Sequence, residues 1–178
     1  GDDTVGFVIR AWDGNSNSIN NVDVRFDIAA INDPPTLTTV SDFTTNEETE
    51  KVISYADLIP ATEAADLDDD RDMFKLISLT SGTLVDQNDQ PVSVGHLLAS
   101  TSINENDTEW KWTPDLNVNG DDTVGFVIRA WDGNLNSASD INVRFDISAE
   151  NDPPTLTTVS DFSISEDTQE VISYVNLA

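Results

Sequence analysis

The sequence predicts an all-β protein folded as a sandwich of two sheets. Two observations support this prediction: short segments alternate apolar and polar residues with a period of two, and turn-forming residues separate these segments. About seven such segments fit into roughly 119 residues, which is typical of an antiparallel β-sandwich. No apolar run is long enough to predict a membrane-spanning helix.

The segments 124–131 and 141–148 show the alternation most clearly. One face carries Val124, Phe126, Ile128 and Ala130 in the first segment, and Ile141, Val143, Phe145 and Ile147 in the second. The connection 132–140 is rich in turn formers, so the two segments are predicted to form an antiparallel hairpin. Further short strands are expected at 36–43, 51–59, 74–80, 82–87 and 108–114. For 85–107 the sequence is compatible with a short helix or a long loop.

The chain repeats itself at an offset of 119 residues. Residues 1–59 pair with residues 120–178, and 17 of these 59 positions differ, which leaves 42 identical. A fixed offset indicates tandem units that share one backbone. We therefore expect three parts: the C-terminal strands of a preceding repeat at 1–31, a complete repeat at 32–152, and the N-terminal strands of a following repeat at 153–178. The chain is then a piece of a longer array.

The composition is strongly acidic. The chain carries 34 Asp and Glu against 8 Lys and Arg, for a formal net charge of −26. Such a charge repels nucleic acids and anionic membranes, so it excludes a nucleic-acid-binding protein. Hydrophobic residues make up 38% of the chain and Trp occurs four times, which predicts a folded protein rather than a disordered one. Because Cys is absent, no disulfide can staple the fold, and a metal ion is the expected substitute.

Acidic residues gather in loops that the sandwich topology is expected to bring together at its two ends. Because antiparallel strands place successive loops at alternate ends, two groups are predicted: linker 31–33 with loops 66–72 and 132–134, and linker 150–152 with loops 46–50 and 117–122. Several carboxylates in one flexible cage are the ligands that Ca²⁺ prefers. The alternative is a set of solvated acidic loops.

The loop 66–72 is the most acidic of these segments. Asp66, Asp68 and Asp70 recur at every second position and can face one ion. The spacing begins like an EF-hand loop, but Arg71 stands where that loop needs Gly, and Ile77 stands where it needs a bidentate Glu. The loop is therefore not predicted to be an EF-hand.

Six motifs follow one another along the chain: "NDPP", "EET", "DLDDD", "WKWTPDLNVNGDDTVGF", "AWDGN" and a second "NDPP". In this order they resemble the cadherin-like tandem repeats of very large bacterial surface proteins and adhesins. The resemblance covers the whole chain and implies an Ig-like, cadherin-like Greek-key β-sandwich, repeated in tandem, with Ca²⁺ at the linkers between repeats. One departure is Asp69, which stands where those repeats usually have Gly.

By position, the resemblance implies two sets of calcium ligands. The first set is Asn32, Asp33, Asp66, Asp68, Asp70 and Asp132, together with Asp2 or Asp3 from the preceding repeat. The second set is Glu47 or Glu48, Asp121 or Asp122, and Asn151 with Asp152.

The function that the resemblance implies is structural and extracellular. The chain would be a calcium-rigidified extender of a large adhesin that is secreted or attached to a cell surface. Its partners would be neighbouring repeats and, through distant domains, a polysaccharide or a cell-surface ligand. Pro34–Pro35 and Pro153–Pro154 hold the chain extended after each Asn-Asp pair, so each joint is expected to flex without metal and to lock with it.

Other functional classes explain fewer features of the sequence. A carbohydrate-binding module would use Trp12 and Trp131, which the alternation places on an outer face, whereas Trp110 and Trp112 are expected in the core. An enzyme is not expected, because the chain has no Cys, its single His is His96, and its acids cluster at the ends of the sandwich. An acidic surface adapted to salt would spread its charge evenly over the strands.

Overall fold

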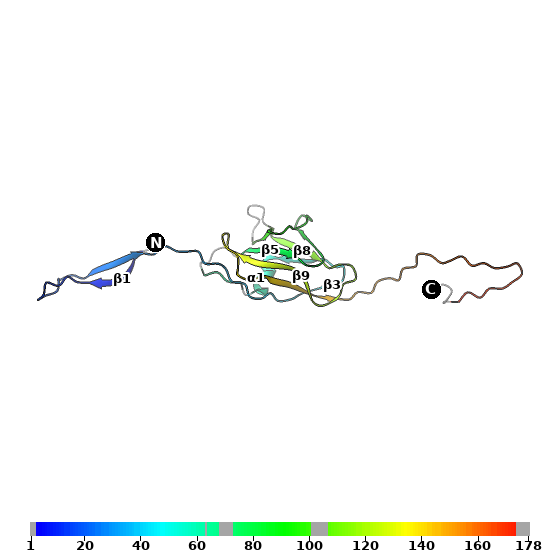
Figure 1. The fold of residues 1–178 in the computed structure, drawn as a ribbon, viewed down its shortest axis with the longest axis horizontal. Helices are drawn as coiled ribbons and strands as arrows, with labels where there is room; N and C mark the ends of the chain where they lie inside the picture. Colours follow the sequence, from blue (N-terminus) through cyan, green and yellow to red (C-terminus); the bar gives the residue numbers. More distant parts are fainter. Residues whose placement is uncertain (1–2, 63, 68–72, 101–106, 174–178) are drawn as a thin grey trace.

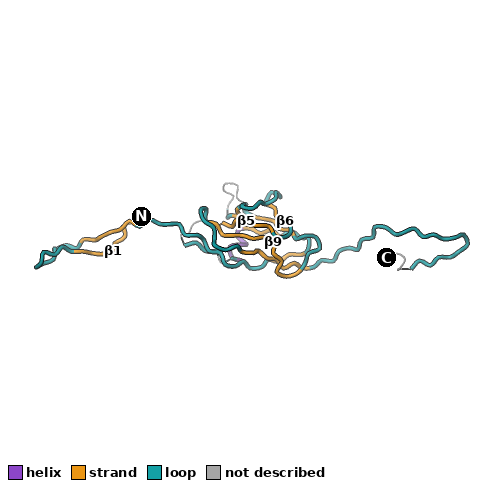
Figure 2. The backbone as a smooth tube through the Cα atoms, in the orientation of Figure 1, coloured by secondary structure: helices purple, strands orange, loops and turns teal. Residues whose placement is uncertain are grey.

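The computed structural model describes residues 3–62, 64–67, 73–100 and 107–173. A sandwich of two β-sheets lies in the middle of the molecule, a separate β-hairpin projects from one end, and an extended segment leaves the other end (Figures 1 and 2). The regular secondary structure of the described residues is mostly β-strand in several sheets, which is consistent with an Ig-like β-sandwich.

The larger sheet of the sandwich has the strand order β3-β10-β9-β5-β7. These strands are β3 (Phe43–Asn46), β10 (Ile141–Ser148), β9 (Gly120–Trp131), β5 (Met73–Leu79) and β7 (Leu97–Leu98). β9 and β10 form the antiparallel hairpin that the alternation predicts. β3 joins the edge of β10 in parallel, with Phe43 opposite Phe145.

The smaller sheet has the order β4-β8-β6, with β4 (Lys51–Ser54), β8 (Glu109–Thr113) and β6 (Thr83–Asp86) all antiparallel to their neighbours. Consecutive strands such as β3 and β4 lie in different sheets, so the chain crosses between the two layers at their ends.

The core between the sheets is apolar and aromatic. The predicted inner faces are confirmed, because Phe126, Ile128, Val143 and Phe145 are all fully buried. Trp110 and Trp112 are also fully buried, as expected, and the ring of Trp112 stacks on Phe145 with 3.8 Å between centroids. Large rings packed in this way contribute much of the buried apolar area.

Residues 51–59 were expected to form one strand, and this prediction is wrong in its second half. β4 ends at Ser54, and α1 (Tyr55–Ala61) follows it. The Ser54 hydroxyl accepts a hydrogen bond from the Asp57 N–H, and the Asp57 carboxylate accepts one from the Ser54 N–H. This reciprocal capping box satisfies N–H groups at the helix start, and Leu58 anchors the helix in the core.

The segment 36–43, also expected as a strand, is mostly irregular. Thr36 and Val40 form only isolated bridges, to Ala65 and Thr62 respectively. The segment follows the loop after α1 instead of joining a sheet, and regular pairing begins only at Phe43. Within the described part of 85–107 the structure has turns, the end of β6 and the two-residue strand β7, and no helix.

The terminal parts lie outside the sandwich. β1 (Asp3–Ile9) and β2 (Val22–Asp27) pair with the register of their repeat copies: Val5 faces Arg25 and Phe7 faces Val24, as Val124 faces Arg144 and Phe126 faces Val143. The described residues after β10 form no helix or strand. No described helix is long and apolar enough to cross a membrane.

Candidate functional sites at the two ends of the sandwich

At the end where the chain enters the sandwich, the linker is tied to the β9–β10 connection. The Asn32 side-chain amide donates a hydrogen bond of 2.9 Å to Asp132 Oδ2. The other carboxylate oxygen of Asp132 accepts the backbone N–H groups of Asn134 and Leu135, each at 2.6 Å. The predicted grouping of linker 31–33 with loop 132–134 is therefore confirmed.

Asp132 is a buried carboxylate, with only 8% of its surface exposed. Burial by itself raises its pKa, but hydrogen bonds from Leu135, Asn32 and Asn134 outweigh this, so the pKa lies below its ordinary value. The group is consequently ionised at neutral pH. Its partners are neutral amides, and no ion pair among the described residues includes it.

Two further predicted ligands meet at the same end. Asp33 of the linker and Asp66 of the loop after α1 line one open hollow of about 400 Å³, together with Pro34, Thr36, Ala65 and Leu67. Reciprocal backbone hydrogen bonds of 2.7 and 3.1 Å between Thr36 and Ala65 hold the linker against this loop. Asp68 and Asp70 lie outside the described residues.

At the opposite end, Glu47 follows β3 and is 6% exposed. Its Oε1 accepts a hydrogen bond from the Asn119 amide of the β8–β9 connection, and its N–H donates to Ser148 O at 2.9 Å. Beside it, the Asn46 amide donates to Glu150 Oε1 of the exiting linker at 2.5 Å. Loops 46–50 and 117–122 thus meet the linker 150–152, as predicted.

The other ligands predicted for this end are spread out. Glu48 and Asp122 both have left-handed backbone conformations, with φ of 55° and 58°, and both are exposed, as is Asp121 in β9. The Asp122 N–H donates to Asp146 Oδ1 at 3.0 Å. The Asn151 amide donates to the backbone oxygen of the neighbouring Asp152 at 3.1 Å. None of these contacts joins them to Glu47.

The β1–β2 hairpin supplies no ligand to the linker among the described residues. Asp3 lies opposite Asp27 in the hairpin, where its carboxylate is 3.9 Å from Arg25 Nη1. Asp2 lies outside the described residues. Across the residues that are described, no three Asp, Glu or His side chains come close enough to hold a metal ion as a preformed cluster.

Sequence reasoning missed three residues that join the loops at the exit end: Asn46, Asn119 and Glu150. Their loops were singled out for acidity, so the amides that bridge the carboxylates were overlooked. The signal was present, because each amide stands in the sequence within an acidic loop that was already expected at that end.

Residues 32–146 match the profile of the bacterial Ig domain family. The chain belongs to this family. Bacterial Ig domains of this kind are structural, non-catalytic modules that are commonly found on surface proteins. No curated protein and no solved structure shows significant similarity to the chain.

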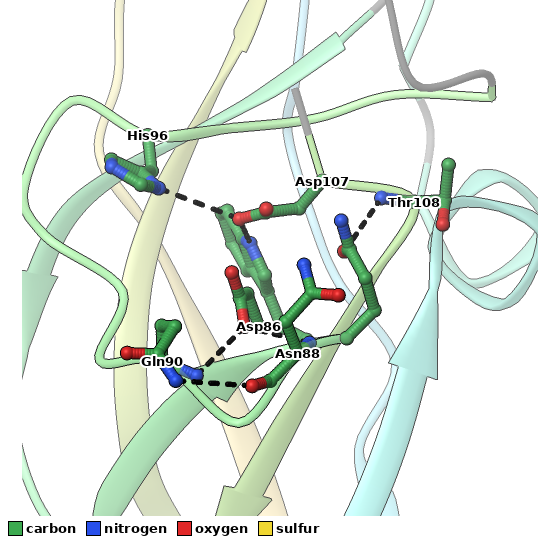
Figure 3. A network of polar contacts seen from close by, with 8 residues as sticks. Asp86, Asn88, Gln90, His96, Asp107 and Thr108 are labelled. Atoms are coloured by element: carbon green, nitrogen blue, oxygen red, sulfur yellow. Dashed lines mark hydrogen bonds and ion pairs between the residues drawn. The ribbon is translucent and has the colours of Figure 1, made fainter. Parts of the chain in front are cut away.

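The single histidine of this bacterial Ig domain belongs to a structural network. Asp107 is 3% exposed, accepts the Trp110 indole N–H at 2.7 Å, and lies 3.5 Å from His96 Nδ1 (Figure 3). On the same side, Asp86 Oδ1 accepts the backbone N–H groups of Asn88 and Gln90, each at 2.8 Å (Figure 3). These contacts fasten the long 87–108 connection to the sandwich.

The two tryptophans proposed for sugar binding differ in their surroundings. Trp131 is half-buried, with Lys75 Nζ 4.0 Å from the centre of its ring, so a cation–π contact already covers it. Its repeat copy Trp12 lies in the hairpin and is exposed. The bacterial Ig domain therefore does not present Trp131 as an open stacking platform.

Proposed function

We propose that this chain is an extender segment of a bacterial surface protein, in which Ca²⁺ stiffens the joints between consecutive Ig domains. In this proposal 32–152 is a complete repeat, 1–31 ends the preceding repeat, and 153–178 begins the next. Family membership and the repetition of the sequence support the tandem arrangement. The parent protein would be extracellular, and its distant domains would bind a polysaccharide or a cell-surface ligand.

One observation carries the calcium proposal: each end of the sandwich holds a buried carboxylate beside a linker. At the entry end, Asp132 accepts a hydrogen bond from Asn32 of the linker. At the exit end, Glu47 directly follows Asn46, whose amide donates to Glu150 of the linker. Both carboxylates are held by neutral N–H and amide donors, and a cation beside them would add the opposite charge that these donors lack. Neither group takes part in an ion pair of the described residues.

The donor chemistry fits Ca²⁺ at the entry end. The ion takes six to eight hard oxygen ligands in a flexible arrangement. Asp132, Asn32, Asp33 and Asp66 offer carboxylate and amide oxygens from the linker and from two loops. Asp68 and Asp70 follow Asp66 in the sequence and would add to this set. Thiol and imidazole ligands, which would favour zinc, are absent from these four residues.

The joint would stiffen because the cation couples the linker to the loops. Without it, each close pair of carboxylates repels by about 1 kcal/mol even in bulk water, which favours open arrangements of the linker. When the cation is bound, the carboxylates no longer only repel one another, because each is attracted to the same ion. Pro34 and Pro35 fix their own φ angles directly after Asp33, so the linker has few other torsions through which to relax.

A thermal melt of the full chain in Ca²⁺, in Mg²⁺ and in chelator tests the calcium proposal. Binding to the folded state alone adds about 2.7 kcal/mol of stability at one hundred times the Kd, so Ca²⁺ should raise the Tm clearly and Mg²⁺ should not. Asp132→Asn should remove the part of the rise that the entry end contributes. Its repeat copy Asp13, whose carboxylate accepts the same two turn N–H groups without a linker amide, supplies the matched control Asp13→Asn. A parent chain with the same Tm in all three solutions would contradict the proposal.

The alternative function is a carbohydrate-binding module. Its sequence basis is Trp12 and Trp131, and the Lys75 contact with Trp131 argues against an open sugar platform. Binding of the chain to immobilised polysaccharides that Trp131→Ala abolishes would favour this alternative over the extender.

A further inference from the structure

The connection between β8 and β9 contains the only Asn-Gly pair of the chain, Asn119–Gly120. The amide carbon of an asparagine lies within reach of the backbone nitrogen of the next residue, and a glycine there places no side chain in the way. Both residues are exposed, and Asn119 lies outside the strands. Apart from its chain neighbours, no atom of the described structure lies within 4 Å of where a methyl group on Gly120 would stand. The pair is therefore open to solvent.

The backbone gives a reason for the glycine. Gly120 has a φ of 127°, a conformation that residues with a side chain rarely adopt. Near it, Asn117 and Asp122 also have positive φ angles, of 56° and 58°, so the chain enters β9 through an irregular backbone. The fold thus sets after Asn119 the residue that leaves its amide most accessible.

The amide of Asn119 supports a buried acid at the exit end of the sandwich. It donates a hydrogen bond to Oε1 of Glu47, which is 6% exposed. A buried carboxylate depends on such donors, because burial has removed most of its contact with water. A chemical change of this amide would therefore be felt by Glu47.

We propose that Asn119 is a site of spontaneous deamidation in the folded protein. The backbone nitrogen of Gly120, after losing its proton to hydroxide, attacks Asn119 Cγ and closes a succinimide ring. Such an attack is favoured because both groups belong to neighbouring residues. The bond between Cγ and Nδ2 breaks, and Nδ2 takes up a proton from water and leaves as ammonia. Water then opens the ring at either carbonyl, which gives aspartate or isoaspartate, so the net reaction consumes water and releases ammonia.

Both products weaken the exit end. A carboxylate replaces the amide donor beside Glu47, so a hydrogen bond gives way to repulsion between like charges. In isoaspartate the main chain also runs through the former side-chain methylene, which lengthens the backbone directly before β9. The reaction needs no metal, and the inference holds whether or not calcium stiffens the joints.

Peptide mapping of the stored full chain by mass spectrometry tests the reaction. Trypsin cleaves after Lys111 and Arg129, and the asparagines of the peptide between them are Asn117 and Asn119. Asn117 is the matched control, since it is also exposed but is followed by Val118. After storage at neutral pH, Asn119 should lose its amide while Asn117 keeps it. The loss should be faster at mildly alkaline pH, because the attacking nitrogen must be deprotonated.

A sample digested without storage corrects for conversion during digestion, and storage in urea gives the rate in the unfolded chain. The proposal is overturned if Asn119 keeps its amide in the folded chain, whatever happens in urea. Equal conversion of Asn117 and Asn119 would overturn the role assigned to Gly120.

Asn119→Asp imitates one product and tests the structural effect. In urea unfolding followed by Trp fluorescence, it should raise the equilibrium constant for unfolding at least about fivefold, because a buried acid loses its donor. Asn117→Asp is the control, since it adds the same charge to the same connection at a side chain with no hydrogen bond to Glu47 in the described structure. Equal effects of the two substitutions, or no effect of Asn119→Asp, would overturn the proposed weakening.

Asn119→Gln links the two measurements. Glutamine keeps an amide but closes the corresponding larger ring far more slowly, so this variant should unfold alike before and after storage. The parent chain should unfold at lower urea after storage than before it. A stored parent that has lost the amide of Asn119 and still unfolds as the fresh protein does would contradict the proposed effect on Glu47.

Discussion

At the scale of single residues, the chain uses buried carboxylates as acceptors that hold loops in place. Asp107 accepts a hydrogen bond from the Trp110 indole N–H. Asp132 accepts one from the side-chain amide of Asn32 in the linker. Glu47 accepts one from the Asn119 amide. Each of these acids lies in a connection and not within a strand of the sheets. The connections are therefore held by specific polar contacts as well as by the core.

Asp107→Ala should destabilise the sandwich by about 1–3 kcal/mol, because it leaves the buried Trp110 N–H without its acceptor. Urea unfolding followed by Trp fluorescence measures the loss. Asp89→Ala is the control, since that carboxylate contacts Lys111 at the exposed surface, where an ion pair adds little. Equal stability of the parent and Asp107→Ala would show that the Trp110 contact is not needed.

At the scale of elements, the alternating strands were predictable and the departures have local causes. The inner faces of β9 and β10 follow directly from period two in the sequence. The helix α1 was missed because its apolar residues continue those of β4, while the decisive capping pair, Ser54 and Asp57, is polar. The segment 36–43 was overassigned because its β-branched residues favour a strand, whereas tertiary contacts to the loop after α1 decide its path.

The sequence predicts which loops form each candidate site better than it predicts which side chains make contact there. Topology alone brings acidic loops to both ends, since antiparallel strands alternate their connections. Which side chains meet depends on local turns. The turn after β9 directs the Asp132 side chain toward the linker. Glu48 and Asp122 instead have left-handed backbone conformations, which set different directions for their side chains. Such turns depend on packing that a sequence pattern does not encode.

Gly125→Ala should destabilise the sandwich by about 1–3 kcal/mol, because a methyl group there would lie 2.5 Å from Phe145 and 2.9 Å from Trp112. Urea unfolding gives the value. Its repeat copy supplies the control, since Gly6→Ala changes the hairpin and should leave the unfolding of the sandwich unaltered. Equal effects of the two substitutions would contradict this account of β9 packing.

At the scale of the whole molecule, the chain is a folded domain between two partial copies of itself (Figure 1). The bacterial Ig domain is the folded body, and the proposed stiffening acts at its two acidic ends.

Small-angle X-ray scattering of the full chain, extrapolated to infinite dilution, tests the stiffening of the joints most directly. In Ca²⁺ the distance distribution should extend further than in chelator. Asp132→Asn should lose the part of that difference that comes from the entry joint, whereas Asp13→Asn should keep all of it. The same distribution with and without Ca²⁺ in the parent chain would contradict the central claim.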